Sequence, residues 1–196
     1  MISINTQSSI KITGNKIIYF DPYQIKEELH DADYIFITHD HYDHYDIDSI
    51  NKIKNDNTEF IIPEVIDIDG LKVLPNKEYK IDDIYFKTIP SYNIDKSFHP
   101  KDRNYVGYII NIENVTYYIA GDTDITEENK KVKCDIALVP IGGTYTMDYK
   151  EAANLINEIK PTIAIPTHYG SIVGSKEDGE KFRELLNEKI KCDLLI

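Results

Sequence analysis

Short apolar runs, separated by polar or turn-forming residues, recur along the whole chain. Each run is four to six residues long and rich in Ile, Val, Tyr and Phe, which favour extended backbone. The pattern predicts eight β-strands, at residues 16–20, 34–38, 59–62, 84–89, 105–110, 115–119, 135–139 and 162–165.

Helical spacing of apolar residues is clearest in the last third of the chain. Asp148 can cap a helix whose Glu151 suits the positive first turn, and Pro161 ends it. A second apolar stripe lies near the C-terminus, and a short helix is expected after Asp46. The apolar positions are Ala152, Leu155, Ile156 and Ile159; then Phe182, Leu185, Leu186 and Ile190; and Ile47, Ile50 and Ile53. Many strands with few helices predict two packed sheets with helices outside, in an α/β or α+β fold.

Length and composition support one compact domain spanning 1–196, because the chain has no linker, repeat or low-complexity stretch. No apolar run reaches the 18 or so residues of a membrane span, and the N-terminus has no signal-peptide pattern. Cys134 and Cys192 are far apart and form no CxxC motif, so we expect free thiols. A cytoplasmic protein is the resulting expectation.

Charge restricts the partners. The net charge is −12, and the chain has only two arginines, Arg103 and Arg183. Phosphate backbones and anionic membranes attract clustered Lys and Arg, so we expect neither long nucleic acids nor membranes as partners. A small-molecule substrate is expected instead, and a homo-oligomer is compatible with the sequence. Bound divalent cations would add local positive charge that this count omits.

The segment Thr38–His44, with the sequence THDHYDH, follows directly after an apolar predicted strand. Imidazole nitrogen and carboxylate oxygen are donors that zinc and neighbouring metals prefer. In extended backbone, residues two apart share a side, so His39 and His41 can converge on one ion. Asp43 and His44 fall where the chain turns toward the helix expected after Asp46, and they can face a second ion.

The HxHxDH pattern after a strand resembles the metallo-β-lactamase superfamily, and the resemblance continues in order along most of the chain. Its further motifs are Asp21-Pro22, as in the ascorbate-6-phosphate-lactonase-like branch, Gly121-Asp122-Thr123, the run 140–147 and Pro166-Thr-His168-Tyr-Gly170. The resemblance implies an α+β fold, a four-layer αββα sandwich of two mixed sheets flanked by helices. It places the metals at one edge of the sheets.

The resemblance also implies a ligand set for two divalent metal ions, of which zinc is the first expectation and manganese or iron suits the same donors. His39 and His41 would bind the first ion; Asp43, His44 and His168 the second; and Asp122 would bridge them. Gly121 would let the backbone pass close to the site without a Cβ clash.

The third ligand of the first ion departs from the family pattern. Many relatives have a histidine where this chain has Ser91-Tyr92-Asn93. His99 is the only histidine between His44 and Asp122, so we assign it as the ligand. His30 is interpreted as a solvated residue.

The predicted chemistry is hydrolysis by a bridging hydroxide, with Asp43 both holding its metal and orienting the nucleophile. Tyr145 and Tyr169 are near motif residues and could donate to an oxyanion, although packing is the more ordinary role for either. Arg103 and Lys101 lie just beyond His99 and could bind a substrate carboxylate or phosphate, or form a solvated loop without function.

The sequence therefore predicts a metal-dependent hydrolase acting on a small anionic ester, lactone or phosphodiester. Three alternatives are a redox protein, a nuclease and a sensor. The redox alternative is disfavoured because di-iron relatives carry an acidic residue where His41 stands, and the nuclease is disfavoured by the charge and length of the chain. A non-catalytic metal or ligand sensor would bind metal without turnover.

Overall fold

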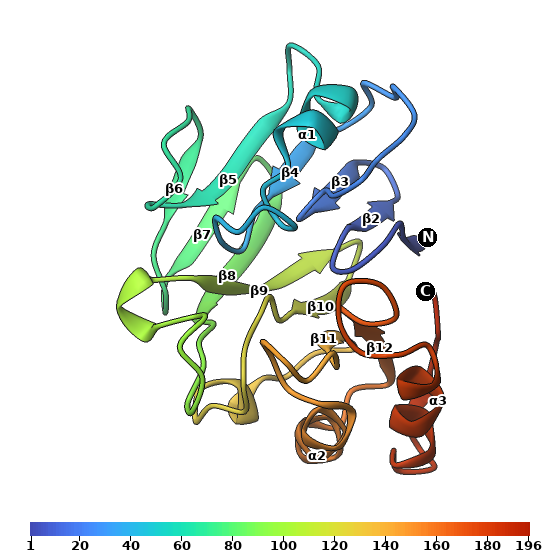
Figure 1. Cartoon of the computed structure of the whole chain (residues 1–196). Helices are drawn as coiled ribbons and strands as arrows, with labels where there is room; N and C mark the ends of the chain where they lie inside the picture. Colours follow the sequence, from blue (N-terminus) through green and yellow to red (C-terminus); the bar gives the residue numbers. More distant parts are fainter.

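Two mixed β-sheets face each other in the computed structural model, which describes residues 1–196 (Figure 1). The six-stranded sheet has the order β1-β2-β3-β4-β5-β6 and the seven-stranded sheet the order β13-β12-β11-β10-β9-β8-β7. The strands are β1 Ile2–Ile4, β2 Ile10–Thr13, β3 Ile17–Phe20, β4 Tyr34–Phe36, β5 Glu59–Pro63, β6 Leu71–Val73, β7 Glu78–Ile81, β8 Ile84–Pro90, β9 Val106–Ile112, β10 Val115–Ile119, β11 Ile136–Pro140, β12 Ile163–Thr167 and β13 Lys191–Cys192. The helices are α1 Ile47–Ile53, α2 Tyr149–Ile159 and α3 Glu177–Glu184, with short 3₁₀ turns at Lys101–Arg103 and Asn129–Lys131.

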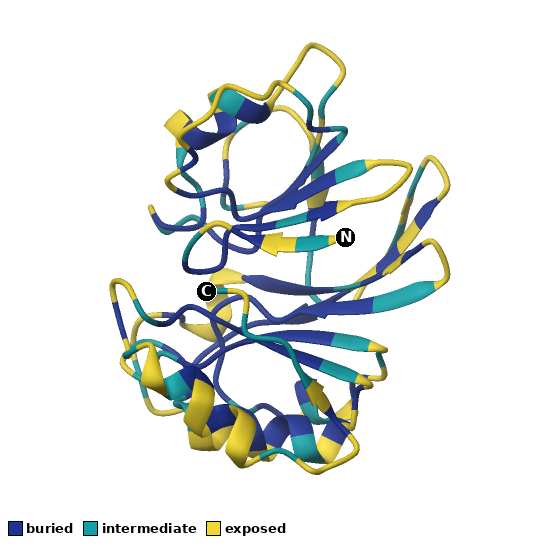
Figure 2. Ribbon diagram, turned by 90° about the vertical axis from the view of Figure 1, so that its right-hand side faces the viewer, coloured by how far each residue is buried: buried dark blue, intermediate teal, exposed yellow.

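Three separate hydrophobic clusters lie between four layers. The largest joins the facing sides of the two sheets, the second packs α2 and α3 against the seven-stranded sheet, and the third packs α1 against the six-stranded sheet. Figure 2 shows the buried residues within the sheets and along the inner sides of the helices, with exposed residues outside. The predicted α+β, four-layer αββα sandwich is confirmed.

Alternation along single strands explains why both sides of each sheet are apolar. In β10, Tyr117 and Ile119 enter the cluster between the sheets, whereas Tyr118 enters the cluster beneath α2. In β3, Phe20 faces the opposite sheet while Tyr19 faces the α1 side. Because successive side chains point to opposite faces, a strand covered on both sides needs a continuous apolar run. The eight predicted runs all form strands, and β8 is the one that alternates, since Ile84 and Phe86 are buried while Tyr85 and Lys87 are exposed.

Five strands were not predicted from the sequence. β1, β2, β6, β7 and β13 are two to four residues long and include exposed or half-buried polar positions, so they lack a continuous apolar run. They occupy the outer parts of the two sheets, where one side is free of packing. Their pairing with longer neighbours, rather than their own pattern, fixes them as strands.

Helices α1 and α2 begin where their capping residues predict. Asp46 accepts from the backbone N–H of Asp48, and Asp148 forms a reciprocal capping box with Glu151. The C-terminal stripe was predicted too long: α3 contains Phe182 and ends at Glu184. Beyond it the chain turns and pairs β13 with β12, so Leu186 and Ile190 reach the second cluster from outside a helix. None of the helices has both the length and the apolar character to cross a bilayer.

Candidate metal centre

The predicted ligands meet at one edge of the sandwich. His39, His41, Asp43 and His44 lie in the loop that follows β4, and His99 lies between β8 and β9. Asp122 comes three residues after the end of β10, and His168 comes directly after β12. β10, β11 and β12 run parallel, so their C-terminal ends meet at the same edge.

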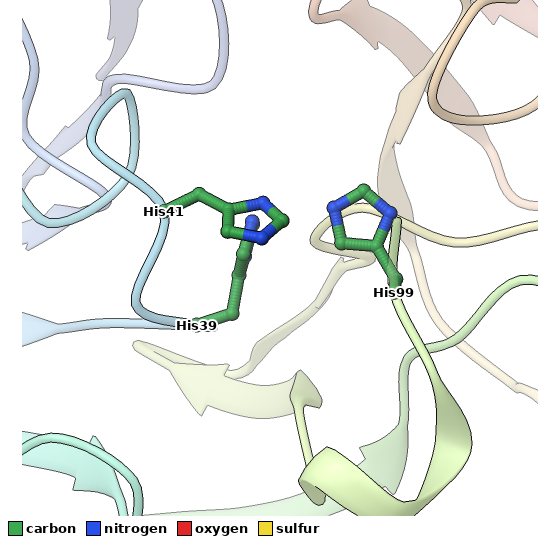
Figure 3. Close-up of side chains that lie close together, drawn as sticks. All are labelled: His39, His41 and His99. Atoms are coloured by element: carbon green, nitrogen blue, oxygen red, sulfur yellow. The ribbon is translucent and has the colours of Figure 1, made fainter. Parts of the chain in front are cut away.

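His39, His41 and His99 form one group of possible metal donors, each offering a ring nitrogen within 4.8 Å of the others. Figure 3 shows His39 and His41 from one loop with their rings directed toward the ring of His99, which comes from a separate loop. The ring centroids lie 4.7 to 5.0 Å apart. The three side chains predicted for the first ion are therefore brought together.

Asp43, His44 and His168 form a second group with the same 4.8 Å limit. Asp122 lies between the two groups. Its Oδ1 is 3.4 Å from His44 Nε2, and its Oδ2 is 3.2 Å from His168 Nε2 and 3.4 Å from His99 Nε2. A carboxylate that approaches both groups has the placement expected of a bridging ligand.

Neighbouring side chains determine which ring nitrogen of each histidine faces the centre. His39 Nδ1 lies 2.9 Å from Thr38 Oγ1, His99 Nδ1 lies 3.0 Å from Asn93 Oδ1, and His44 Nδ1 lies 2.7 Å from Asp21 Oδ2. The Nε2 atoms of these three histidines and Oδ1 of Asp122 are buried without any hydrogen-bond partner. Buried polar atoms are normally satisfied, so this set of unpartnered donors fits divalent metal ions.

Asp21 is a site residue whose role the sequence analysis missed. Its carboxylate accepts three hydrogen bonds of 2.7 Å, from Thr38 N, Thr38 Oγ1 and His44 Nδ1. Since Thr38 Oγ1 gives its proton to Asp21, it accepts from His39 Nδ1, and Nε2 of His39 keeps a free lone pair. Asp21 also lies close enough to His39 and His44 to be a ligand by distance, but these hydrogen bonds already engage both oxygens. This arrangement suits a residue that orients the neighbouring histidines better than it suits a metal ligand.

The charge states suit metal binding. Burial lowers the pKa of His39 and His41 and lowers that of His99 to about 4, so all three are neutral near pH 7. Burial also acts to lower the pKa of His44, but Asp122 and Asp21 outweigh it and raise that pKa well above its usual value. This direction favours the protonated imidazole, and an ion bound at Nε2 of His44 would have to displace that proton.

The two carboxylates stay ionised despite their surroundings. Burial acts to raise both pKa values. For Asp43, the hydrogen bond from His168 and the charge of His44 outweigh burial and lower the pKa. For Asp122, the charges of His168 and His44 lower the pKa well below its ordinary range. Both groups can thus act as anionic ligands near neutral pH.

A pocket of about 330 Å³ opens over the centre. This is near the lower limit for small-molecule sites, which run from about 300 to 1,000 Å³. Its lining consists of five predicted ligands and four further side chains: His41, Asp43, His99, Asp122, His168, Tyr42, Phe98, Tyr145 and Ile172.

Only one of the four predicted substrate-binding residues lines this pocket, namely Tyr145. Arg103 donates to Asp40 Oδ2 at 2.6 Å, and Lys101 donates to Glu128 Oε1 at 3.0 Å. The 3₁₀ turn Lys101–Arg103 places both side chains beside carboxylates outside the pocket lining. Tyr169 is buried in the cluster beneath the helices, where its hydroxyl approaches Gly179 of α3.

Two smaller expectations are also met. Gly121 has a φ of +65°, and a Cβ there would lie 3.0 Å from Thr38 Cβ, so the close approach requires glycine. His30 is exposed and remote from both ligand groups, with its Nδ1 at 2.8 Å from the carbonyl oxygen of Lys54.

The chain is similar to known proteins in sequence and in structure. The Beta-lactamase superfamily domain model matches residues 2–168. A UPF0173 protein of Pyrococcus abyssi is 33% identical, over 92% of this chain and 87% of the relative. A UPF0173 metal-dependent hydrolase of Pyrococcus horikoshii is 29% identical, over 94% of this chain and 91% of the relative. The crystal structure of a proposed metal-dependent hydrolase of Parabacteroides distasonis superposes with a TM-score of 0.85 at 28% identity, covering 98% and 91% of the two chains.

Proposed function

Because the chain belongs to the beta-lactamase superfamily and is similar to metal-dependent hydrolases over nearly its whole length, we propose that it is a metal-dependent hydrolase with a dinuclear centre. The observation that carries the proposal is the pair of donor groups that share Asp122, with buried nitrogens lacking any other partner. Zinc is the proposed metal, and manganese or iron suits the same donors.

Two adjacent divalent ions would supply an activated water and a polarised scissile oxygen. Asp43 lines the pocket, and its Oδ2 lies 3.2 Å from His168 Nε2. With its lowered pKa it is available to orient the attacking water and accept its proton. The proton then passes to the leaving alkoxide, so an ester or lactone is converted to an acid and an alcohol by one water.

The proposed substrate is a small molecule containing an ester, a lactone or a phosphodiester. The net charge of −12 argues against long nucleic acids and anionic membranes as partners. A cytoplasmic location is part of the proposal. The pocket volume supports a small substrate.

Elemental analysis of purified protein, followed by a panel of lactones, carboxylic esters and phosphodiesters, tests the proposal. We expect two metal equivalents per chain and turnover of at least one substrate class. His41→Ala should remove most metal from the first group and nearly all activity. Asp43→Asn should retain part of the metal and lose turnover, because an amide cannot accept the proton.

His30→Ala is the matched control, since it removes an exposed imidazole outside both groups. It should change neither metal content nor activity. Two metal equivalents retained in His41→Ala would refute the ligand assignment. Stable metal binding without turnover of any substrate class would instead identify the sensor that the sequence left open.

A further inference from the structure

The walls of the pocket above the metal centre are apolar. Apart from the predicted ligands, the lining residues are Tyr42, Phe98, Tyr145 and Ile172. Tyr42, Phe98 and Ile172 are 66%, 45% and 39% exposed, and three of the ten large exposed hydrophobic residues of the molecule therefore gather at one opening. A concentration of exposed apolar side chains around a functional pocket marks a binding surface for an apolar group.

No cationic side chain lines this pocket. The three basic residues closest to His99 in the chain are already paired: Lys101 with Glu128 at 3.0 Å, Lys96 with Asp124 at 2.7 Å and Arg103 with Asp40 at 2.6 Å. A charged group on the substrate, away from the reacting bond, would meet aromatic and aliphatic carbon instead of a counter-charge. Moving a charge from water to such surroundings is unfavourable when nothing pairs with it.

The walls are held in place before any ligand binds. Phe98 and Tyr145 stack edge to face, with ring centroids 4.7 Å apart. Asn93 connects their two loops, because its amide donates to the Tyr145 carbonyl at 2.9 Å while its oxygen accepts from the backbone N–H of His99 at 3.0 Å. Tyr42 is supported edge to face by Tyr23 at 6.0 Å. Preorganised walls keep the ordering cost of binding low.

We propose that the substrate is an uncharged ester or lactone that carries an apolar, preferably aromatic, group next to the scissile bond, and that Tyr42, Phe98, Tyr145 and Ile172 hold this group. The proposal rests on the proposed hydrolase function and replaces the anionic substrate expected from the sequence. Water adds to the carbonyl carbon, the carbon–oxygen bond to the leaving group breaks, and the proton passes to that oxygen.

The test compares phenyl butyrate with 4-carboxyphenyl butyrate and with bis(4-nitrophenyl) phosphate, using protein loaded with zinc. We expect kcat/KM for the neutral ester to exceed that for its carboxylate analogue by at least about tenfold, which corresponds to about 1.4 kcal/mol. Phe98→Ala should raise KM for phenyl butyrate about tenfold with two zinc ions retained. Tyr85→Ala removes an aromatic side chain that is 60% exposed on β8, and it should leave KM unchanged.

Turnover of the carboxylate or phosphodiester substrate that equals or exceeds that of phenyl butyrate would overturn the apolar assignment. It would still support the proposed hydrolase function. An unchanged KM in Phe98→Ala would also overturn the apolar assignment. A separate experiment tests binding to the walls without turnover: benzyl alcohol is added, and the amide NMR shifts of Phe98, Tyr145 and Ile172 are monitored. Shifts at these residues in a protein that hydrolyses no substrate would refute the proposed function while supporting the apolar pocket. No shifts would refute the pocket assignment itself.

Discussion

The two sheets contribute to the proposed metal centre in different ways. The six-stranded sheet supplies its proposed ligands in one short segment, His39–His44, in the loop after β4. The seven-stranded sheet supplies His99, Asp122 and His168 from three separate connections. On the first side one buried carboxylate, Asp21, holds both Thr38 and His44, whereas on the second side separate neutral groups contact the His99 ring and the backbones of Asp122 and His168.

The difference determines how many of the proposed ligands a single substitution would disturb. Asp21 reaches His44 directly and His39 through Thr38, so its loss affects ligands of both ions. On the opposite side, His99 is the only one of the proposed ligands that Asn93 contacts, and Ser91 donates to the backbone of Asp122 at 2.8 Å. The backbone N–H of His168 donates separately to the Gln7 carbonyl oxygen at 3.0 Å. A contiguous set of ligands is thus built around a shared support, and a dispersed set around independent ones.

Removing the shared support should have the largest effect. Asp21→Ala should weaken binding of both ions, each by about 10- to 100-fold, because groups that orient ligating histidines contribute on that scale. Zinc affinities measured by chelator competition would show it. Asp31→Ala is the control, since it removes a carboxylate bonded to Lys11 and Tyr19 far from the centre. Loss of only one ion in Asp21→Ala would contradict the shared role.

An independent support should affect one ion alone. Asn93→Ala removes the acceptor for His99 Nδ1, so the first ion should bind about tenfold more weakly while the second binds as before. Asn157→Ala removes a comparable amide that joins α2 to the segment 185–187, and it should change neither affinity. Titration with cobalt, whose absorption separates the two sites, would measure both steps. Equal weakening of both ions would remove the distinction between the two sides.

The smallest effect is expected for Arg103, which contacts the ligand segment through Asp40. Both side chains are partly exposed, and such ion pairs contribute about 0 to 1 kcal/mol, so Arg103→Ala should weaken the first ion at most about fivefold. KM should stay unchanged for neutral and anionic substrates alike. A rise in KM for anionic substrates only would restore the anion-binding role that the sequence suggested.

Most of the fold could be predicted because the strands covered on both faces carry their own signal. The runs at β3, β4, β5 and β9 to β12 are largely apolar, β8 begins with buried and exposed residues in alternation, and the caps of α1 and α2 lie in the sequence. Short outer strands carry no such signal and depend on their partners. The end of α3 likewise depends on the pairing of β13 with β12, which is a long-range contact.

The segment His39–His44 could be predicted as a metal-binding motif because its donors are neighbours in sequence. The role of Asp21 could not be predicted, although the Asp21-Pro22 pair is part of the resemblance. Asp21 adopts a φ of 45°, and its partners Thr38 and His44 are 17 and 23 residues away. The directions of Lys101 and Arg103 were also hidden, because they depend on Glu128 and Asp40, which only the fold brings near.

The dispersed origin of the ligands has a consequence for protein synthesis. His168 follows His39 by 129 residues, and a ribosome adding about 5 to 20 residues per second needs on the order of ten seconds to cover that interval. During this time the nascent chain presents His39 and His41 without their partners from the other sheet. All ligands of the proposed centre can therefore come together only after β12 has been translated, which would make metal loading a late event in the maturation of each new molecule.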